Sequence, residues 1–508
     1  MVMEWRVGVV MGSLGLLLWF VVILRKRSWR AGWSWSSRYG VNNSKKNNNN
    51  KAAAAAVANL LPPGSLGWPL LGESLQFVAS LSSALSPDSF AQQHLAKYGD
   101  VFKTHLFGHP TVVSLDPEVN KFVMNNEGRL FVASHPESFE ELFGKYTILA
   151  ARGDVHKRKR AVVVNFINSE KFRESIIPCV ETFALLTLNN WKDRVVYVER
   201  EAQKFAFRVI MKKLLSLPVG PDLEDMLKEF SMVVAGSLSV RLKMIPWSNY
   251  SKGLKARDRI IKKLTGIIEG RRKDFDNDYN DLLQAVFRED RHGGATTSFS
   301  TEDIVDQILF LLAAGYDTVA AIITSTMFFL RRAPEALQTL REEHEAIKKG
   351  KINPAENLTW ADYKSMTFTQ HVINESLRIT NVGFGAFRTA LEDVKIKGYT
   401  IPKHWKVLAY LRSAHFNPSI YGPDPYAFDP WRWQDQSENM INGEASFMPF
   451  GEGKRRCVGS DLARLELSIF FHHLVTRFRN WELIEEDRLT YFPTPHFMKS
   501  LPVVLEAS

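Results

Sequence analysis

The chain contains very little cysteine. Only Cys179 and Cys457 occur among its 508 residues, so at most one disulfide bridge can form. A small secreted scaffold held together by several disulfides is therefore excluded, and the composition suits a reducing compartment. The scarcity also leaves Cys457 free to act as a ligand.

Net charge is nearly absent from most of the chain. The formal net charge is +10, but residues 1–51 carry nine Lys or Arg against one acid, which leaves +2 for the other 457 residues. A nucleic-acid-binding domain is expected to cluster basic residues on its folded surface. The charge distribution therefore argues against a nucleic-acid partner and assigns the basicity to an N-terminal segment.

An apolar run stands in that basic segment. Residues 7–24 carry no charge, and as a helix they span roughly 27 Å, close to the thickness of a bilayer core. Basic residues 25–27 follow directly, which favours retention of that end in the cytosol. A cleaved signal peptide would instead carry its positive charge before the run. We expect a single-pass membrane anchor over residues 1–30 and a low-complexity linker over residues 31–60.

The remaining residues, 61–508, have mainly helical patterns. Alternation and β-branching over residues 100–113 predict two strands around a turn at Gly108, and residues 393–402 predict a second pair. Beyond Pro117 helical stretches prevail. The sequence therefore predicts a mainly α fold with smaller β-sheets (α+β); that these residues form one large domain is implied only by the family resemblance given below.

A long apolar helix is predicted between Ser300 and Pro334. Ser300 and Asp303 form a capping box at its start, and no proline interrupts the run before Pro334. Its centre reads Ala-Gly-Tyr-Asp-Thr over residues 314–318. A glycine, an acid and a hydroxyl are each unfavourable inside a helix, so their joint presence indicates a function. A threonine that bonds back to a helix carbonyl can open the backbone ladder. A kinked structural helix is the alternative.

Residues 447–459 place one thiol among glycines and bases. Glycine lets a backbone pass close to a flat ligand. A thiolate stays ionised where positive charge surrounds it, and three consecutive bases stand directly before Cys457, namely Lys454, Arg455 and Arg456. A helix predicted over residues 461–471 would direct the positive end of its dipole toward the sulfur. The alternative is an inert, buried cysteine beside a basic turn.

This loop resembles the haem-thiolate loop of the cytochromes P-450, whose pattern Phe-x-x-Gly-x-Arg-x-Cys-x-Gly is matched by residues 450–459. The resemblance implies the cytochrome P-450 fold, haem b (iron protoporphyrin IX) as cofactor, and Cys457 as the axial ligand of the iron. It also implies a haem-contacting set, which consists of Cys457, Arg455, Phe450, Gly451, Gly459, His156, Arg160 and Arg388. Arginines in this set suit the carboxylates of the haem propionates.

The resemblance to this family also implies roles for three further groups of residues. The motif at residues 314–318 matches its acid–alcohol motif, which implies that Asp317 and Thr318 are catalytic and deliver protons for oxygen activation. The family's buried Glu-x-x-Arg network implies a structural role for three residues, Glu375, Arg378 and Arg432. Candidates for the substrate pocket, each of which could equally be plain core, are Phe310, Ala313, Ala314, Val382, Phe384, Phe387, Phe497 and Met498.

Within the family the chain resembles the plant brassinosteroid hydroxylases. The likeness rests on residues 61–69, 126–131, 363–370, 428–434 and 472–478. It implies a monooxygenase of the endoplasmic reticulum membrane, with its catalytic domain in the cytosol. The expected reaction uses O2 to hydroxylate a steroid, a brassinosteroid precursor or related phytosterol, on side-chain carbon 22 or 23.

Electrons would come from NADPH-cytochrome P-450 reductase. Its acidic surface would meet a basic patch formed by Lys159, Lys454 and Arg456. Three other functions stay open. They are a monooxygenase of another triterpenoid or specialised steroid, a haem-thiolate isomerase or dehydratase, and a non-catalytic steroid-binding membrane protein.

Overall fold

The structure is a computed structural model that describes residues 61–507, apart from 69–70, 84–86, 238, 240, 242, 275–276, 278, 294–297, 354–355, 435–445 and 492–493. The predicted anchor (residues 1–30) and linker (residues 31–60) lie outside the described residues. Leu61–Ser508 forms one compact unit, which starts at the residue where the predicted catalytic domain starts.

Helices make up most of the described chain, as the sequence predicted. They are α3 (Ser74–Ser82), α4 (Ser89–Tyr98), α5 (Pro117–Asn125), α6 (Glu137–Phe143), α7 (Gly153–Asn168), α8 (Glu170–Leu188), α9 (Val198–Leu215), α10 (Pro221–Ser237), α11 (Asn249–Lys273), α12 (Leu282–Gly293), α13 (Thr301–Arg331), α14 (Pro334–Lys349), α15 (Trp360–Ser365), α16 (Thr367–Thr380), α17 (Leu411–His415), α18 (Pro418–Tyr421) and α20 (Ser460–Val475). Two short 3₁₀ helices are η3 (Pro430–Trp433) and η4 (Gly453–Arg455).

The strands form small sheets. They are β1 (Val101–Leu106), β2 (His109–Ser114), β3 (Phe131–Ala133), β4 (Val196–Tyr197), β5 (Ala386–Ala390), β6 (Val394–Ile396), β7 (Tyr399–Ile401), β8 (Lys406–Ala409), β9 (Phe478–Leu483), β10 (Leu489–Thr490), β11 (His496–Phe497) and β12 (Pro502–Ala507). The hairpins β1–β2 and β6–β7 are antiparallel, which confirms both predicted strand pairs.

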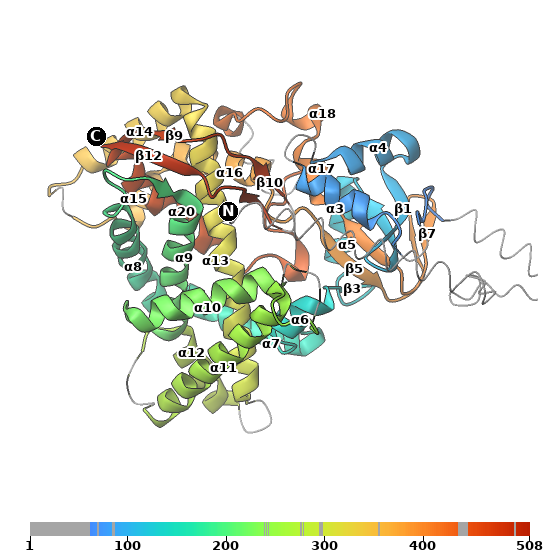
Figure 1. Cartoon of the computed structure of the whole chain (residues 1–508), viewed down its shortest axis with the longest axis horizontal. Coiled ribbons are helices and arrows are strands. Elements are labelled where there is room, and N and C mark those ends of the chain that lie inside the picture. Colours follow the sequence, from blue (N-terminus) through green and yellow to red (C-terminus); the bar gives the residue numbers. More distant parts are fainter. Residues whose placement is uncertain are drawn as a thin grey trace, which may run out of the picture. The chain divides into compact units, whose positions relative to one another are not determined.

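The largest sheet has five strands in the order β1-β2-β8-β5-β3. Only the β2–β8 pair is parallel; its neighbours in the order are antiparallel. Figure 1 shows this sheet with α3, α4 and α5 on one side of the domain and most of the other helices opposite. At its β3 edge Ala133 lies opposite Arg388, and this pairing brings the chain after β3 next to a predicted haem contact.

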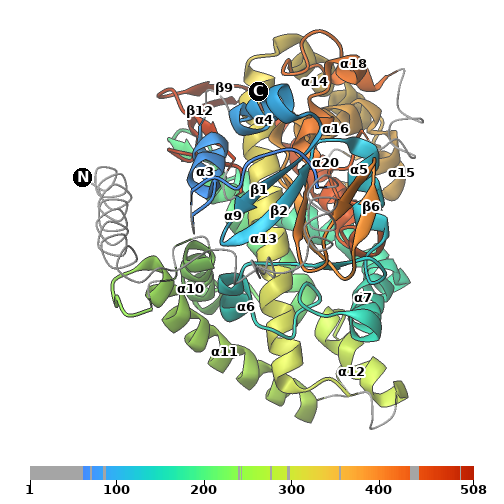
Figure 2. The same ribbon diagram turned by 90° about the vertical axis from the view of Figure 1, so that its right-hand side faces the viewer.

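Helix α13 runs through the middle of the domain, with α9 and α20 among its neighbours (Figure 2). Ser300 and Asp303 form the predicted capping box at its start. Among the described helices α13 alone is long and apolar enough to cross a bilayer, yet 61% of its apolar window is buried within the protein. An all-round apolar helix in that position is a core helix, and its centre carries the residue 314–318 motif into the interior.

Candidate functional site

The loop before α20 is folded tightly around Cys457. The Cys457 amide donates to the Phe450 carbonyl over 2.9 Å, which closes the loop. Gly451 and Gly453 both have positive φ, at 69° and 68°. A Cβ at Gly453 would lie 2.8 Å from the Met124 carbonyl oxygen, so only glycine allows this loop to rest against the end of α5.

Cys457 lies in a recess. Its side chain is exposed, yet enough protein surrounds the sulfur that burial raises the pKa of the thiol. The Gly459 amide and the charges of Arg160 and Arg456 act in the opposite direction. Helix α20 begins at Ser460, so its N-terminal end faces the loop as predicted. A bound metal would displace the thiol proton, because only the thiolate ligates metals.

Arg160 lies beside this sulfur. Its Nη1 atom donates to the Arg456 carbonyl over 2.7 Å, and its charge interacts with Cys457. The ring of Phe450 lies under the guanidinium of Arg464, whose central carbon is 5.4 Å from the ring centroid. The loop therefore carries two cations from outside its own sequence.

A second cluster joins Arg388 and Arg455 through Glu127. Arg455 Nη2 lies 3.2 Å from Glu127 Oε1, and Arg388 Nε lies 3.0 Å from Glu127 Oε2. The second contact is not aligned as a hydrogen bond, so both of its atoms lack a hydrogen-bond partner. Arg455 also donates to three backbone carbonyls, those of Ile148, Leu149 and Ala151.

Two histidines, the half-buried His135 and the buried His156, lie among these cations. Burial, reinforced by Arg388 and Arg455, lowers the pKa of His135 to about 4. Burial, reinforced by Arg455, Arg160 and Lys454, lowers the pKa of His156 to about 4 as well. Both rings are therefore neutral at physiological pH, and the Nε2 atom of His135 has no hydrogen-bond partner.

These residues fit a haem. Buried polar atoms are normally hydrogen-bonded, and the cluster leaves His135 Nε2 and Arg388 Nε without partners. Carboxylates such as the haem propionates would satisfy these atoms and complement the guanidinium groups of Arg388 and Arg455. The recessed Cys457 thiol adds the soft donor that such an iron takes.

The motif on α13 begins with an accessible side chain. Ala314 is exposed although Leu312 and Val319, on either side of the motif, are buried. The Thr318 hydroxyl donates to the Ala314 carbonyl over 2.6 Å, the back-bond that the sequence predicted. The helix is nevertheless continuous from Thr301 to Arg331, so the opened turn is not seen as an interruption.

Asp317 is held on both of its oxygens. Gln203 Nε2 from α9 donates to Oδ1 and the Thr494 hydroxyl donates to Oδ2, each over 3.0 Å. Gly315 lets α9 approach, since a Cβ there would meet the Cδ1 atom of Ile210 at 2.0 Å. The two members of the predicted acid–alcohol pair thus have separate hydrogen-bond partners.

The predicted structural network is present and fully buried at its centre. Arg378 binds Glu375 through two parallel hydrogen bonds of 2.9 and 2.7 Å, and Arg432 Nε binds Glu375 Oε1 over 2.9 Å. Trp433 Nε1 adds a fourth donor to this carboxylate at 3.0 Å. The network ties α16 to η3, far along the chain.

The predicted pocket residues pack against two core clusters: Phe310, Ala313, Val382 and Phe497 belong with the largest one, and Phe384 and Phe387 pack against the second. Phe384 packs on Phe77, Phe387 on Phe107, Phe310 on Phe139 and Phe497 on Phe328. No ring contact within the described residues joins one of the four predicted phenylalanines to another. Ala313 and Val382 are half-buried, and Met498 is 52% exposed.

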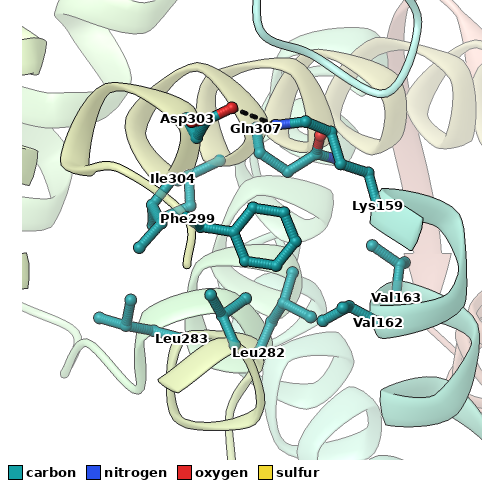
Figure 3. Close-up of a pocket in the computed structure, with 11 residues that line it drawn as sticks. Lys159, Val162, Val163, Leu282, Leu283, Phe299, Asp303, Ile304 and Gln307 are labelled. Carbon is teal, nitrogen blue, oxygen red and sulfur yellow. Dashed lines mark hydrogen bonds and ion pairs between the residues drawn. The ribbon is translucent and has the colours of Figure 1, made fainter. Parts of the chain in front are cut away.

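One prediction about the surface is wrong. Lys159 is only 5% exposed and pairs with Asp303 over 2.6 Å, so it cannot belong to a surface patch. Figure 3 shows it beside Phe299 at a cavity of about 30 Å³ between α7, α12 and α13. That volume holds roughly one water molecule, so the cavity is a packing defect rather than a substrate site. Lys454 and Arg456 are exposed.

Sequence reasoning missed four side chains of the site, which are Glu127, His135, Gln203 and Thr494. Glu127 lies in the stretch 126–131 that carries the family likeness, but no role followed from that stretch, and the other three lie in no motif. Each reaches the site from an element distant in sequence. His135 follows an edge strand and Gln203 lies on the helix across from Asp317. Only the tertiary structure brings them to their partners.

Comparisons with known proteins agree with this site. The family model for Cytochrome P450 matches residues 62–503. A 3-epi-6-deoxocathasterone 23-monooxygenase from Arabidopsis thaliana is 40% identical over 87% of this chain and 89% of its own length. A steroid (22S)-hydroxylase from Oryza sativa subsp. japonica is 39% identical over 87% of each chain.

A solved structure, described as a retinoic acid-bound cyanobacterial CYP120A1, superposes with a TM-score of 0.78. It is 25% identical to this chain and covers 88% of it and 99% of its own length. With a family model that spans nearly the whole described body, and with relatives aligned over almost their full length, the chain belongs to the cytochrome P450 family of haem-containing monooxygenases.

Proposed function

We propose that this chain hydroxylates the side chain of a steroid, a brassinosteroid precursor or related phytosterol, at carbon 22 or 23. The supporting observation is its similarity to plant steroid 22- and 23-hydroxylases over nearly the full length of both chains. In this proposal residues 1–30 anchor the enzyme in the endoplasmic reticulum membrane. Electrons arrive from NADPH-cytochrome P-450 reductase, which meets the exposed Lys454 and Arg456.

In this proposal the sulfur of Cys457 would bind the haem iron. Arg388, Arg455 and the unpartnered Nε2 of His135 would hold the propionates, with His156 beside them. Haem, when bound, supplies the activation of dioxygen, and a thiolate ligand favours cleavage of the O–O bond. The chain's own work is to orient the steroid and exclude water.

Asp317 and Thr318 would handle protons in this scheme. Thr318 lies one helical turn after the exposed Ala314, and its hydroxyl donates to the Ala314 carbonyl. Asp317 accepts hydrogen bonds from Gln203 on α9 and from Thr494 in the C-terminal segment, which fix its carboxylate. Proton transfer by a positioned acid contributes typically about 10²–10⁴-fold to rate.

A second candidate is oxidation of another steroid position or another terpenoid. A 3beta,22alpha-dihydroxysteroid 3-dehydrogenase from Arabidopsis thaliana is 40% identical to this chain, as similar as the 23-monooxygenase. These two relatives are equally similar to this chain, yet their names give oxidation at different steroid carbons. The second candidate is therefore oxidation at a carbon other than 22 or 23. Product identification must therefore accompany any test of turnover.

The full chain in microsomes with reductase and NADPH tests both candidates. Incubation with a panel of free sterols and 22-hydroxylated steroids, followed by mass spectrometry and NMR of products, should give a side-chain alcohol. A ring ketone at carbon 3 or a non-steroid product would support the second candidate. Membrane fractionation tests the anchor. The full chain should be recovered with the membranes, and a chain without residues 1–30 should not.

A matched pair of variants tests the threonine. Thr318→Val should lower product formed per NADPH by about tenfold or more, because it removes a proton-handling hydroxyl. Thr324→Val is the control, since Thr324 makes the same back-bond, to Ala320 over 2.7 Å, in a fully buried part of α13. Equal coupling in the two variants would contradict the assigned role.

A further inference from the structure

Glu199 is a buried carboxyl close to the proposed proton-handling pair. It lies one helical turn before Gln203 on α9, the residue that donates to Asp317. Its side chain is 7% exposed and accepts the Phe497 amide over 3.3 Å. No basic side chain forms an ion pair with Glu199 in the part of the chain that the structure describes. An unpaired carboxyl in such a place is costly to ionise.

The surroundings of Glu199 keep a proton on it. Burial raises the pKa of Glu199 to about 8, and the negative charges of Asp317 and Asp487 act in the same direction. The Phe497 amide and the charge of Arg200 oppose this shift without reversing it. Burial, Asp317 and Glu199 together also raise the pKa of the Tyr316 hydroxyl. These groups, from α13, the C-terminal segment and α9 itself, are the ones that act on the site.

Glu199 lies near the start of α9, where the neighbouring residues Tyr197 and Arg200 are exposed. The Glu199 amide donates to the Ser500 carbonyl over 3.2 Å, which fixes the start of α9 on the C-terminal segment. The same segment contributes Thr494 to Asp317. The backbone at Glu199 and the carboxylate of Asp317 are therefore held by one segment.

We propose that Glu199 is the proton reservoir that resupplies Asp317 during turnover, and that Gln203 and Thr494 are positioning residues that keep Asp317 directed toward it. In the step the O–H bond of Glu199 breaks and an O–H bond forms on Asp317, so one negative charge moves from Asp317 to Glu199. No direct hydrogen bond joins the two carboxyls, so the proposal requires water to carry the proton between them. Solvent water then returns a proton to Glu199. This inference rests on the proton-handling role proposed for Asp317.

The key variant is Glu199→Gln, which keeps an acceptor for the Phe497 amide and cannot release a proton. In the reconstituted holoenzyme we expect product per NADPH to fall roughly tenfold and the solvent isotope effect on turnover to rise. Glu335→Gln, an exposed residue on α14, is the matched control. Glu199→Asp should restore part of the coupling. Wild-type turnover should decline as the pH rises through about 8, because Glu199 then loses its proton. This alkaline decline in turnover should be absent from Glu199→Gln.

Infrared spectroscopy of the holoenzyme without substrate gives an independent readout. Glu466 is also protonated at neutral pH, so the readout is the difference between the wild-type and Glu199→Gln spectra. A protonated-carboxyl stretch should be present in this difference at neutral pH and vanish above pH 8. If the two spectra show no such difference, or if the variant couples like the wild type, the reservoir is refuted. Absence of turnover on every sterol, with the band assigned to Glu199, would instead refute the proposed function alone.

Discussion

At the scale of single residues, the two glycines before Cys457 carry different constraints. Both have positive φ, which costs a residue with a Cβ about 1–2 kcal/mol. Nothing lies within 4 Å of a Cβ at Gly451, whereas one at Gly453 would meet Asn125 Oδ1 at 2.7 Å and the Met124 carbonyl at 2.8 Å. Gly453 therefore also determines how closely the loop can approach α5.

These two glycines give a matched pair of variants. Gly451→Ala should lower the free energy of unfolding by about 1–2 kcal/mol. Gly453→Ala should cost more, because the Met124 backbone must also move. Thermal unfolding of the two variants measures the difference. Equal destabilisation in the two variants would contradict the close approach to α5.

The residue scale also explains which parts of the site were predictable. Cys457, Asp317 and Thr318 stand in local patterns whose chemistry can be read from their immediate neighbours. Glu127 and His135 have no such pattern, because their role comes from the pairing of β3 with β5 beside Arg388. The Lys159 prediction failed for a related reason. The sequence of this basic helix predicts a solvent-exposed Lys159. In the structure Phe299 and Asp303 pack against Lys159 and bury it.

At the scale of elements, the Glu375 network joins α16 to η3. Arg378 binds Glu375 and also donates to three backbone carbonyls, those of His415, Pro425 and Ala427. One side chain thereby organises the segment that leads from α17 to η3. The local pattern predicted the pair, since Glu375 and Arg378 are three apart on a helix, but not these carbonyl partners.

Removal of Arg378 should therefore be severe. Arg378→Met leaves a fully buried carboxylate with one remaining arginine and strands three carbonyls, at a cost of about 3–5 kcal/mol. Arg331→Met is the control, since its pair with Glu482 is at the surface and should be worth under about 1 kcal/mol. Chemical denaturation of both variants measures the difference. A cost for Arg378→Met as small as the control's would show that the network is dispensable.

At the scale of the whole molecule, buried titratable groups on several elements act on stability together. Burial lowers the pKa of His344 and His415 to about 3 and that of His472 to about 2. Burial also raises the pKa of Glu466, like that of Glu199, to about 8. All five groups are neutral in the folded protein near neutral pH. Unfolding would expose them to water and return their pKa values to the ordinary ones.

The two kinds of group limit stability from opposite sides. A histidine with a lowered folded pKa stabilises fully above its ordinary value of 6.5, and this stabilisation is lost as the pH falls. A carboxyl with a raised folded pKa stabilises fully below its ordinary value of 4.5, and this stabilisation is lost as the pH rises toward 8. Below pH 6.5 these three histidines, together with His135 and His156, outweigh the two carboxyls. Between pH 6.5 and 8 the loss from the two carboxyls dominates.

The free energy of unfolding should therefore be largest near pH 6.5 and decline on both sides. Each group contributes a slope of about 1.4 kcal/mol per pH unit at most. Denaturant unfolding across this range should show that Glu466→Gln, whose side chain stays neutral, removes about half of the decline between pH 6.5 and 8. Because Glu466 is not among the groups that act on Glu199, its removal should leave product coupling unchanged, which separates stability from proton delivery. An alkaline decline of wild-type size in Glu466→Gln would mean that this carboxyl ionises inside the folded protein.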